Sequence, residues 1–442
     1  MATSARWPEL SLREAGVALI DCEHRTPPAV PDGYPYVAIP QMKSGRIDPT
    51  TARRVSAEDY VDWTRKALPR DHDVVLSRRT NPGETAVAPP GLEYVLGQNL
   101  VLLRADGSRV YPPFLRWLVR GPEWWEQIGR FLNVGAVFDS LRCADVPNFR
   151  LRIPRIVDQE WMSAVLGALD DKIELNRRMN ETLEATARAL FKSWFVDFDP
   201  VRAKTEGHDP GLPPRVADLF PDSFDDSELG EIPAGWTVEG LGAIADVVDC
   251  SHARKPERRT EGRPLLQLGN IVPYGMLDPS DLFLIDASDY EAWTARIEVR
   301  EGDCVITNVG RVGAVAQIPH GFRAALGRNM TGIRCRPAWP YPTHLIELIR
   351  SDAFRAEVDA RTDTGTILDA LNVRSIPRLR HVHPCAELVR AFEVLARPIR
   401  TRMEDAAMES RNITALRDTL LPRLISGELR VPDAERMVDA RI

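Results

Sequence analysis

The sequence contains one long internal repeat, in which residues 57–192 reappear at low identity 230 positions later. The first matches are Ala57, Asp59, Tyr60, Trp63, Thr64, Arg70, Asp73 and Val75 with Ala287, Asp289, Tyr290, Trp293, Thr294, Arg300, Asp303 and Val305. Later matches join Gly97, Asn99, Gly135, Asp139 and Pro154 to Gly327, Asn329, Gly365, Asp369 and Pro384. A constant offset over this length predicts two divergent copies of one unit of about 200 residues. Such a chain is expected to contact two similar but unequal targets.

The composition is that of a soluble globular protein with more than one domain. The chain has 442 residues, of which 44% are hydrophobic and 27% are charged. No apolar run is long enough for a transmembrane helix, and the N-terminal residues lack the apolar core of a signal peptide. The six cysteines are scattered and form no C-x-x-C pair. We therefore expect a cytoplasmic protein with no membrane partner.

The formal net charge of -7 is concentrated in one segment of the chain. Residues 1–157 contain 21 Lys and Arg against 18 Asp and Glu, whereas residues 158–232 contain 8 against 17. The repeated regions are thus close to neutral, with local basic clusters. This distribution argues against non-specific coating of a polyanion but is compatible with a focused basic groove.

Each copy is predicted to begin with strands and turns and to end in a long helix. Apolar or alternating runs predict strands at residues 36–40, 73–77 and 100–103, with counterparts at 264–268, 303–307 and around Ile333. The 28 glycines and 35 prolines predict many turns between them. The expected fold class is α/β (α+β), with two tandem-duplicated domains, each followed by a long helix.

Both helical segments carry an apolar seam that repeats about every 3.5 residues. Asn176 and Asn180 interrupt the first seam with polar layers, which specify register and partner at a cost in stability. We interpret the two helices as packing on each other; the alternative is that each helix covers only its own domain. The seam positions are Leu166, Leu169, Ile173, Asn176, Asn180, Leu183, Leu190, Trp194, Ile399, Met403, Ile413 and Leu420.

The sequence contains none of the motifs that would indicate catalysis. It lacks a phosphate-binding G-x-x-x-x-G-K-[ST] loop, a G-x-G-x-x-G turn after a strand, and the Asn-Pro-Pro-aromatic motif of amino-methyltransferases. It also lacks a G-x-S-x-G motif and a nuclease-like acidic cluster with lysine. We therefore expect no catalytic residues in this chain.

A D-C-x-H element occurs once in each copy, as residues 21–24 and 249–252. Cysteine and histidine are zinc ligands, but two of them fall short of the four that a structural zinc site uses. A structural turn or a DNA-facing histidine is the preferred interpretation, and no metal is predicted.

The loops after the strands that begin at Asp73 and Asp303 present polar side chains on Gly-containing turns. Arg, Asn and Gln in such positions suit contacts with base edges and phosphates. The alternative is a solvated hairpin tip. The candidates in the first copy are Arg78, Arg79, Asn81, Gln98 and Asn99, and those in the second are Thr307, Asn308, Arg311, Arg328, Asn329, Thr364 and Thr366. Further candidate phosphate contacts are the basic pairs Arg53-Arg54, Arg65-Lys66, Arg254-Lys255 and Arg258-Arg259.

Two long segments resemble those of the specificity subunits of type I restriction-modification systems. The first is LNRRMNETLEATARALFKSWFVDFDPVRAK at residues 175–204, followed by LFPDSF and LGEIPAGW. The second is LRDTLLPRLISGELRV at residues 416–431. Together with the two variable copies, the resemblance covers essentially the whole chain.

This resemblance implies a division of the chain into six parts: target recognition domain 1 at 1–157, a central helix at 158–195, an acidic Pro/Gly-rich linker at 196–232, target recognition domain 2 at 233–385, a C-terminal helix at 386–425 and a tail at 426–442. It implies that each recognition domain reads one half of a bipartite, asymmetric site in double-stranded DNA. The two helices would form an antiparallel coiled coil that acts as a spacer and docks two methyltransferase subunits. Motor-endonuclease subunits would join for cleavage, and S-adenosylmethionine, ATP and magnesium would belong to those partners.

Three alternatives stay open at this stage. The chain could serve a modification-only or other defence complex, because neighbouring genes decide whether the DNA is cleaved. It could instead be a scaffold whose duplicated domains bind protein, or, against the missing motifs, a methyltransferase in its own right. The DNA target sequence and the spacer length do not follow from these loops.

Overall fold

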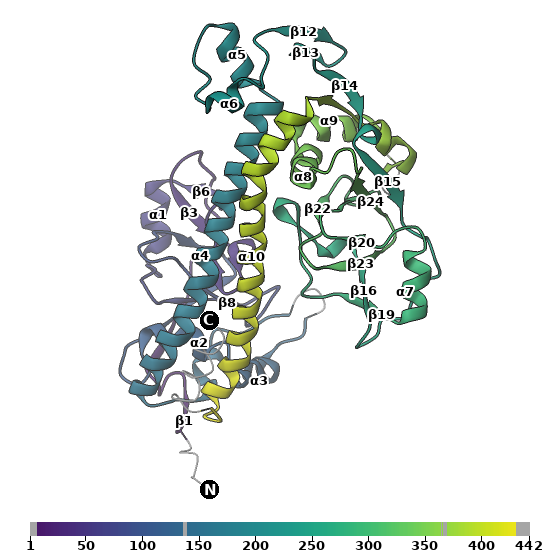
Figure 1. Cartoon of the computed structure of the whole chain (residues 1–442). Helices are drawn as coiled ribbons and strands as arrows, with labels where there is room; N and C mark the ends of the chain where they lie inside the picture. Colours follow the sequence, from purple (N-terminus) through teal and green to yellow (C-terminus); the bar gives the residue numbers. More distant parts are fainter. Residues whose placement is uncertain (1–6, 136–138, 364, 366–368, 430–442) are drawn as a thin grey trace. The chain divides into compact units, whose positions relative to one another are not determined.

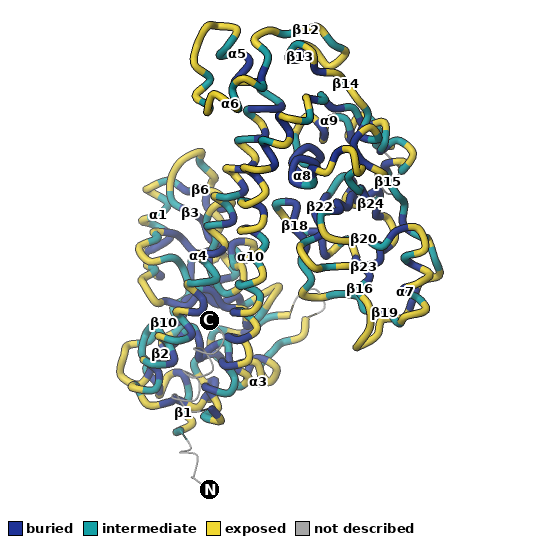
Figure 2. The backbone as a smooth tube through the Cα atoms, viewed as in Figure 1, coloured by how far each residue is buried: buried dark blue, intermediate teal, exposed yellow. Residues whose placement is uncertain are grey.

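The computed structural model describes residues 7–135, 139–363, 365 and 369–429, and the chain forms two compact units. Unit 1 comprises residues 1–174 and 412–442, and unit 2 comprises residues 175–411. Each unit combines strands with helices (Figure 1), and the buried stretches coincide with its strands and with one face of each long helix (Figure 2). The mixed α/β composition expected from the sequence is confirmed.

Unit 1 is organised around a six-stranded sheet of order β2-β10-β7-β8-β5-β4, in which β2, β10, β7 and β8 pair antiparallel. A smaller sheet has the order β6-β3-β9, and β1 pairs with β11. The bounds of its elements are β1 Glu9–Ser11, β2 Val17–Ile20, β3 Tyr34–Val37, β4 Met42–Lys43, β5 Arg46–Ile47, β6 Arg54–Val55, α1 Ala57–Thr64, β7 Val74–Ser77, β8 Thr85–Val87, β9 Val95–Leu96, β10 Leu100–Ala105, α2 Leu115–Leu118, α3 Pro122–Phe131 and β11 Arg150–Arg152.

Unit 2 contains a four-stranded antiparallel sheet of order β15-β24-β21-β22 and a second sheet of order β19-β16-β23-β20. The bounds of its principal elements are β14 Thr237–Gly240, β15 Ala245–Asp249, β16 Arg263–Leu266, β17 Ile271–Val272, β18 Met276–Leu277, β19 Phe283–Ile285, α7 Ala287–Thr294, β20 Val299–Arg300, β21 Cys304–Thr307, β22 Val315–Gln317, β23 Arg323–Leu326, β24 Met330–Cys335, α8 Pro342–Arg350, α9 Asp352–Ala360, β25 Thr362–Asp363, β26 Ala370–Leu371 and β27 Arg380–His383.

The repeat in the sequence extends to the bounds of the elements. Helix α7, strand β21 and strand β24 begin and end 230 residues after α1, β7 and β10. Helices α1 and α7 also have the same kind of N-cap. The side chain of Ser56 accepts a hydrogen bond from the backbone N–H of Asp59, and that of Asp286 accepts one from the backbone N–H of Asp289. Both copies thus use the same local signals to form the same elements.

The long helices are α4, Ile156–Phe195, and α10, Ala386–Ile425, and each unit contains part of both. In unit 2, Asn176 Nδ2 donates to the carbonyl of Ala406 at 3.4 Å, and Asn180 Nδ2 donates to that of Met403 at 3.2 Å. The partner number falls as the donor number rises, so these segments run antiparallel. In unit 1, Leu166 and Leu420 belong to one core.

The predicted seam positions are all removed at least partly from solvent. Eight are buried: Leu166, Leu169, Asn176, Asn180, Trp194, Met403, Ile413 and Leu420. Four are half-buried: Ile173, Leu183, Leu190 and Ile399. Burial of two amides in an otherwise apolar seam is consistent with the register role suggested for them.

The segment predicted as a linker is folded in the structure. Residues 196–232 contain α5 Asp199–Thr205, α6 Pro214–Ala217, strand β12 Phe224–Ser227 and most of its paired strand β13 Gly230–Pro233. Phe198, Val201 and Phe220 are buried in the same core as Trp194. Helices this short give no periodic signal, which is why the sequence suggested irregular chain.

Unit 2 has two buried histidines and one half-buried histidine near the C-terminal end of α4. His344 is 1% exposed and lies 5.1 Å, centroid to centroid, from Phe195, while His381 is 4% exposed. Burial, and then the neighbouring histidines, lower the pKa of His344 to about 3 and that of His381 to about 4. Burial also lowers the pKa of His383. These imidazoles are therefore neutral in the folded protein at neutral pH.

These histidines predict that unit 2 loses stability in acid. As the pH falls below about 6.5, these histidines become protonated in the unfolded chain but stay neutral in the folded chain, where their pKa is lower. Each histidine should then reduce the free energy of unfolding by about 1.4 kcal/mol per pH unit until its folded pKa is reached. Urea denaturation at pH 7 and pH 5 measures this, and His381→Phe should show a smaller difference between the two pH values than the native chain. The exposed His208 provides the control His208→Asn, whose pH dependence should match the native one; identical dependence for His381→Phe would contradict the prediction.

Candidate nucleic-acid interface

One surface pocket of unit 1, of about 560 Å³, is lined by four candidate DNA contacts and by the histidine of the first D-C-x-H element. The lining residues are His24, Arg78, Arg79, Thr80, Gln98 and Asn99. They come from three separate segments: the loop after β2, the turn after β7 and the turn before β10. Of the lining residues, only Thr80 was not a candidate from the sequence. Its φ of 67° is uncommon for a β-branched residue, so the sequence does not predict this backbone conformation.

Backbone hydrogen bonds hold the two turns of this pocket together. The N–H of Arg78 donates to the carbonyl of Asn99 at 3.0 Å, and the N–H of Leu141 donates to the carbonyl of Arg78 at 2.9 Å. Within the turn, Ser77 Oγ donates to the carbonyl of Arg79 at 2.9 Å. Asn81 is exposed in the same turn but does not line the pocket. Backbone hydrogen bonds to two other segments thus hold the turn that carries Arg78 and Arg79.

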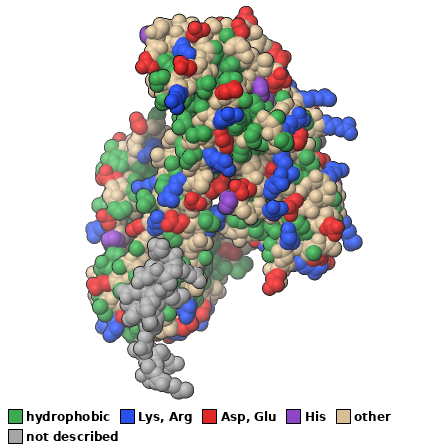
Figure 3. Space-filling view, viewed as in Figure 1, with side chains coloured by type: hydrophobic (Ala, Val, Ile, Leu, Met, Phe, Trp, Pro, Cys, Tyr) green, Lys and Arg blue, Asp and Glu red, His purple; other side chains and the backbone are tan. Residues whose placement is uncertain are grey.

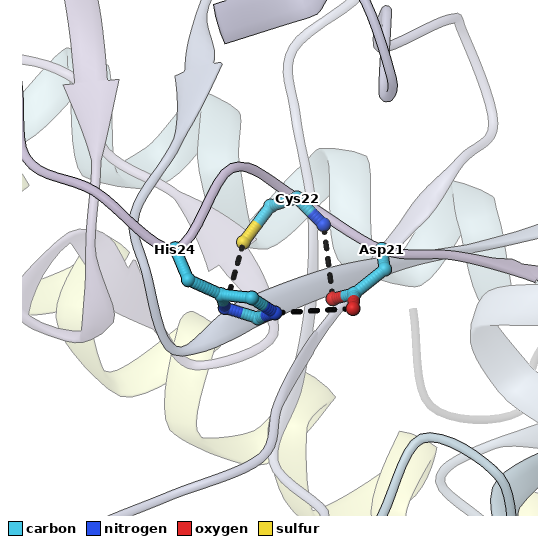
Figure 4. A group of neighbouring side chains, drawn as sticks. All are labelled: Asp21, Cys22 and His24. Atoms are coloured by element: carbon cyan, nitrogen blue, oxygen red, sulfur yellow. Dashed lines mark hydrogen bonds and ion pairs between the residues drawn. The ribbon is translucent and has the colours of Figure 1, made fainter.

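His24 of the D-C-x-H element lines the pocket, and Figure 4 shows its contacts with Asp21 and Cys22. His24 Nε2 lies 3.1 Å from Asp21 Oδ2, and His24 Nδ1 lies 3.0 Å from the carbonyl oxygen of Gln98. Cys22 is buried, and burial, followed by the charge of Asp21, raises the pKa of its thiol to about 11. The histidine therefore joins the β2 loop to the turn that carries Gln98.

The equivalent turns of unit 2 have the same backbone bond but different side-chain positions. The N–H of Asn308 donates to the carbonyl of Asn329 at 2.8 Å, as Arg78 does to Asn99. However, Asn308 is buried and its Nδ2 donates to Thr331 Oγ1 at 2.8 Å. Thr307 is fully buried and its hydroxyl donates to the carbonyl of Arg311. These two candidates are structural in this conformation and do not face solvent.

The other candidates of unit 2 are exposed where the structure describes them. Arg311 donates to the carbonyl of Ile271 at 2.7 Å, and Arg328 donates to that of Ala253 at 3.3 Å. Asn329 is exposed with a φ of 66°. Thr364 and Thr366 lie outside the described residues. Unit 2 therefore presents two arginines and one asparagine on the corresponding turns.

Several predicted basic clusters are engaged within the protein. Arg65 pairs with Asp62 at 2.6 Å, Lys66 pairs with Glu23 at 3.1 Å, and Arg53 lies 5.0 Å over the ring of Tyr36. Arg258 pairs with Asp281, and Arg259 pairs with Glu257. On the face shown in Figure 3, basic and acidic side chains are interspersed. These clusters are weaker candidates for phosphate contacts than the pocket arginines.

Comparisons with known proteins find relatives that are similar to the chain over most of its length. No family model matches it. The type I restriction enzyme HindI specificity subunit of Haemophilus influenzae is 24% identical over 426 residues, covering 85% of this chain and 90% of that protein. The MjaIX specificity subunit of Methanocaldococcus jannaschii is 24% identical over 366 residues, covering 81% and 78%. The curated homologues of this chain are type I restriction enzyme specificity subunits.

A solved structure shows the same fold for a protein of this family. The crystal structure of the type I restriction-modification S subunit from M. genitalium has a TM-score of 0.60 and 14% identity, covering 96% of this chain and 97% of that one. Specificity subunits are the non-catalytic DNA-recognition components of type I systems, as the missing catalytic motifs suggested. In the described part of the chain, no helix is both long and apolar enough to cross a membrane.

Proposed function

We propose that each repeat of this specificity subunit reads one half of a bipartite, asymmetric site in double-stranded DNA. The observation that carries the proposal is the convergence of Arg78, Arg79, Gln98 and Asn99 on one pocket of unit 1. Arginine suits the O6 and N7 acceptors of guanine, and glutamine or asparagine suits the N6 and N7 of adenine. The turns of unit 2, with Arg311, Arg328 and Asn329, would read the other half.

The helices α4 and α10 would form an antiparallel coiled-coil spacer, with target recognition domains at residues 1–157 and 233–385. The cross-helix bonds of Asn176 and Asn180 support the pairing. The spacer would dock two methyltransferase subunits, and motor-endonuclease subunits would join for cleavage in the cytoplasm. S-adenosylmethionine, ATP and magnesium would be bound by those partners and not by this chain. A modification-only complex would use the same surfaces, since the partner subunits determine whether the recognised DNA is methylated or cleaved.

Truncation of a pocket side chain tests the reading role. Arg79→Ala and Gln98→Ala should each weaken binding of the assembled complex to its own site by about 1–3 kcal/mol where a base is read. Melting temperature should barely change, because both side chains are exposed. Fluorescence anisotropy with a duplex that contains the methylated motif of the intact system measures the affinity.

Arg13→Ala is the matched control, since Arg13 is an exposed arginine of unit 1 outside the pocket lining. A lowered melting temperature with unchanged DNA affinity in the pocket variants would assign the pocket to structure. Salt separates DNA reading from a protein-binding scaffold, because DNA affinity set by phosphate contacts falls steeply with ionic strength.

A further inference from the structure

The second D-C-x-H element has three ligand atoms, one more than the cysteine and histidine counted in the sequence. Asp249 ends strand β15, and its Oδ2 lies 2.9 Å from His252 Nε2. Cys250 Sγ lies 3.7 Å from the same Nε2 and also 3.7 Å from Nδ1 of that ring. Asp249, Cys250 and His252 each place one ligand atom within 4.8 Å of the others. The structure therefore brings a carboxylate, a thiol and an imidazole together at one point.

These separations are close to those of a tetrahedral zinc site. Zinc bonds of about 2.3 Å to sulfur and about 2.0 Å to nitrogen or oxygen place S and N about 3.5 Å apart and N and O about 3.3 Å apart. The observed 3.7 Å and 2.9 Å differ from these values by less than about half an ångström. Small side-chain rotations would complete the geometry, leaving a fourth position for water.

The surroundings of Asp249 and Cys250 also suit a cation. Asp249 Oδ1 is buried and accepts no hydrogen bond from the described residues. A thiolate and a carboxylate together neutralise the charge of a zinc ion, and histidine remains neutral as a ligand. Arg296 Nη1 lies 3.7 Å from Asp249 Oδ2 and is the cation that the carboxylate faces in this structure. Between the diverged copies, Asp, Cys and His are retained while the third residue of the element changes from Glu23 to Ser251.

The first copy is arranged less favourably for a metal ion. Cys22 Sγ faces His24 Nδ1 at 3.8 Å, whereas Asp21 Oδ2 faces the other ring nitrogen at 3.1 Å (Figure 4). One metal ion cannot use both nitrogens of a ring. Arg78 also places a guanidinium nitrogen 3.5 Å from His24 Nδ1. In unit 2, by contrast, the thiol and the carboxylate both lie within 3.7 Å of the same nitrogen, His252 Nε2.

We propose that Asp249, Cys250 and His252 bind one zinc ion. The ion would anchor the end of β15 to the start of the basic loop that contains Arg254 and Lys255. Zinc binding at this element is separate from DNA recognition and can be tested without DNA.

The experiment measures metal bound to the full chain without a histidine tag. After incubation with zinc chloride and gel filtration, mass spectrometry of the metal should find one zinc ion per chain. Cobalt should produce a thiolate-to-cobalt charge-transfer band. Cys250→Ser and His252→Asn should each weaken zinc binding more than about tenfold and remove or diminish this band. Circular dichroism of each variant checks that it remains folded.

Two cysteine variants provide matched controls. Cys385→Ser removes an exposed cysteine outside both elements, and Cys22→Ser removes the cysteine of the first copy. Both should retain one zinc ion and the cobalt band. The proposal is overturned if the native chain retains no zinc, or if Cys250→Ser retains it unchanged. Loss of zinc in Cys22→Ser alone would place the ion in unit 1 and overturn the assignment. If Cys250→Ser fails to fold, Asp249→Asn, which keeps the size of the side chain, should still bind zinc more weakly than the native chain.

Discussion

Replacing residues 1–157 with the equivalent part of another specificity subunit should change one half of the recognised DNA site and leave the other half unchanged. The physical reason is that the unit 1 pocket is formed only by residues between His24 and Asn99. No lining residue comes from the second copy. The replacement ends at the beginning of α4, at Ile156, so the remainder of that helix is retained.

Sequencing of methylated DNA from a host with the complete system measures the outcome. The reciprocal replacement of residues 233–385 is the control and should change the other half of the motif. A change in both halves after either replacement would show that the copies do not read DNA independently. The expected effect is a complete switch of one half-site, which makes this the most decisive test of the proposed function.

Asp170→Ala should destabilise unit 1 by about 3–5 kcal/mol, the usual result of leaving buried charge without its partner. Asp170 is 3% exposed and accepts from Arg417 Nη1 of α10 at 2.6 Å. It also accepts from Arg116 of α2 and lies 3.4 Å from Arg46 of β5. Burial opposes ionisation, but these arginines outweigh it and lower the pKa of Asp170 below its usual value. One carboxylate thus joins both long helices to the sheet region of unit 1.

The neighbouring Asp171 provides the matched control for this experiment. Its side chain is 76% exposed, and it pairs with Arg46 at 2.9 Å. Asp171→Ala should therefore cost less than about 1 kcal/mol, as is usual for an exposed ion pair. Urea denaturation of the isolated chain, followed through the tryptophans, compares the two variants. Equal stabilities would mean that the buried arginines find other partners when Asp170 is removed.

The elements that depend on local sequence were predicted well. The strands expected at 73–77 and 100–103 appear as β7 and β10, and the helical segments appear as α4 and α10. Their signals are apolar periodicity and backbone hydrogen bonds within one segment or between neighbouring strands. The helices at 199–205 and 214–217 were not predicted, because they are too short to show a helical period of apolar residues.

The sequence identified candidate DNA-contacting residues but could not predict which of them face solvent, because the direction of a side chain depends on contacts with distant residues. Asn308 matches the partly exposed Arg78 in position, yet it is buried and bonds to Thr331 of β24, and Thr307 matches the buried Ser77. The direction of a turn residue is decided by what packs against it, and those partners lie far away in the chain.

The sequence by itself determined the duplication, the paired helical seams, the absence of catalytic motifs and the resemblance to specificity subunits. These features are carried by repeated or periodic patterns, which persist whatever the surrounding packing. Only the tertiary structure decided which distant side chains meet: His24 with the arginine turn, and Asp170 with arginines from three elements. Such meetings arise from long-range packing, in which the burial of apolar cores brings together polar groups that no local pattern connects.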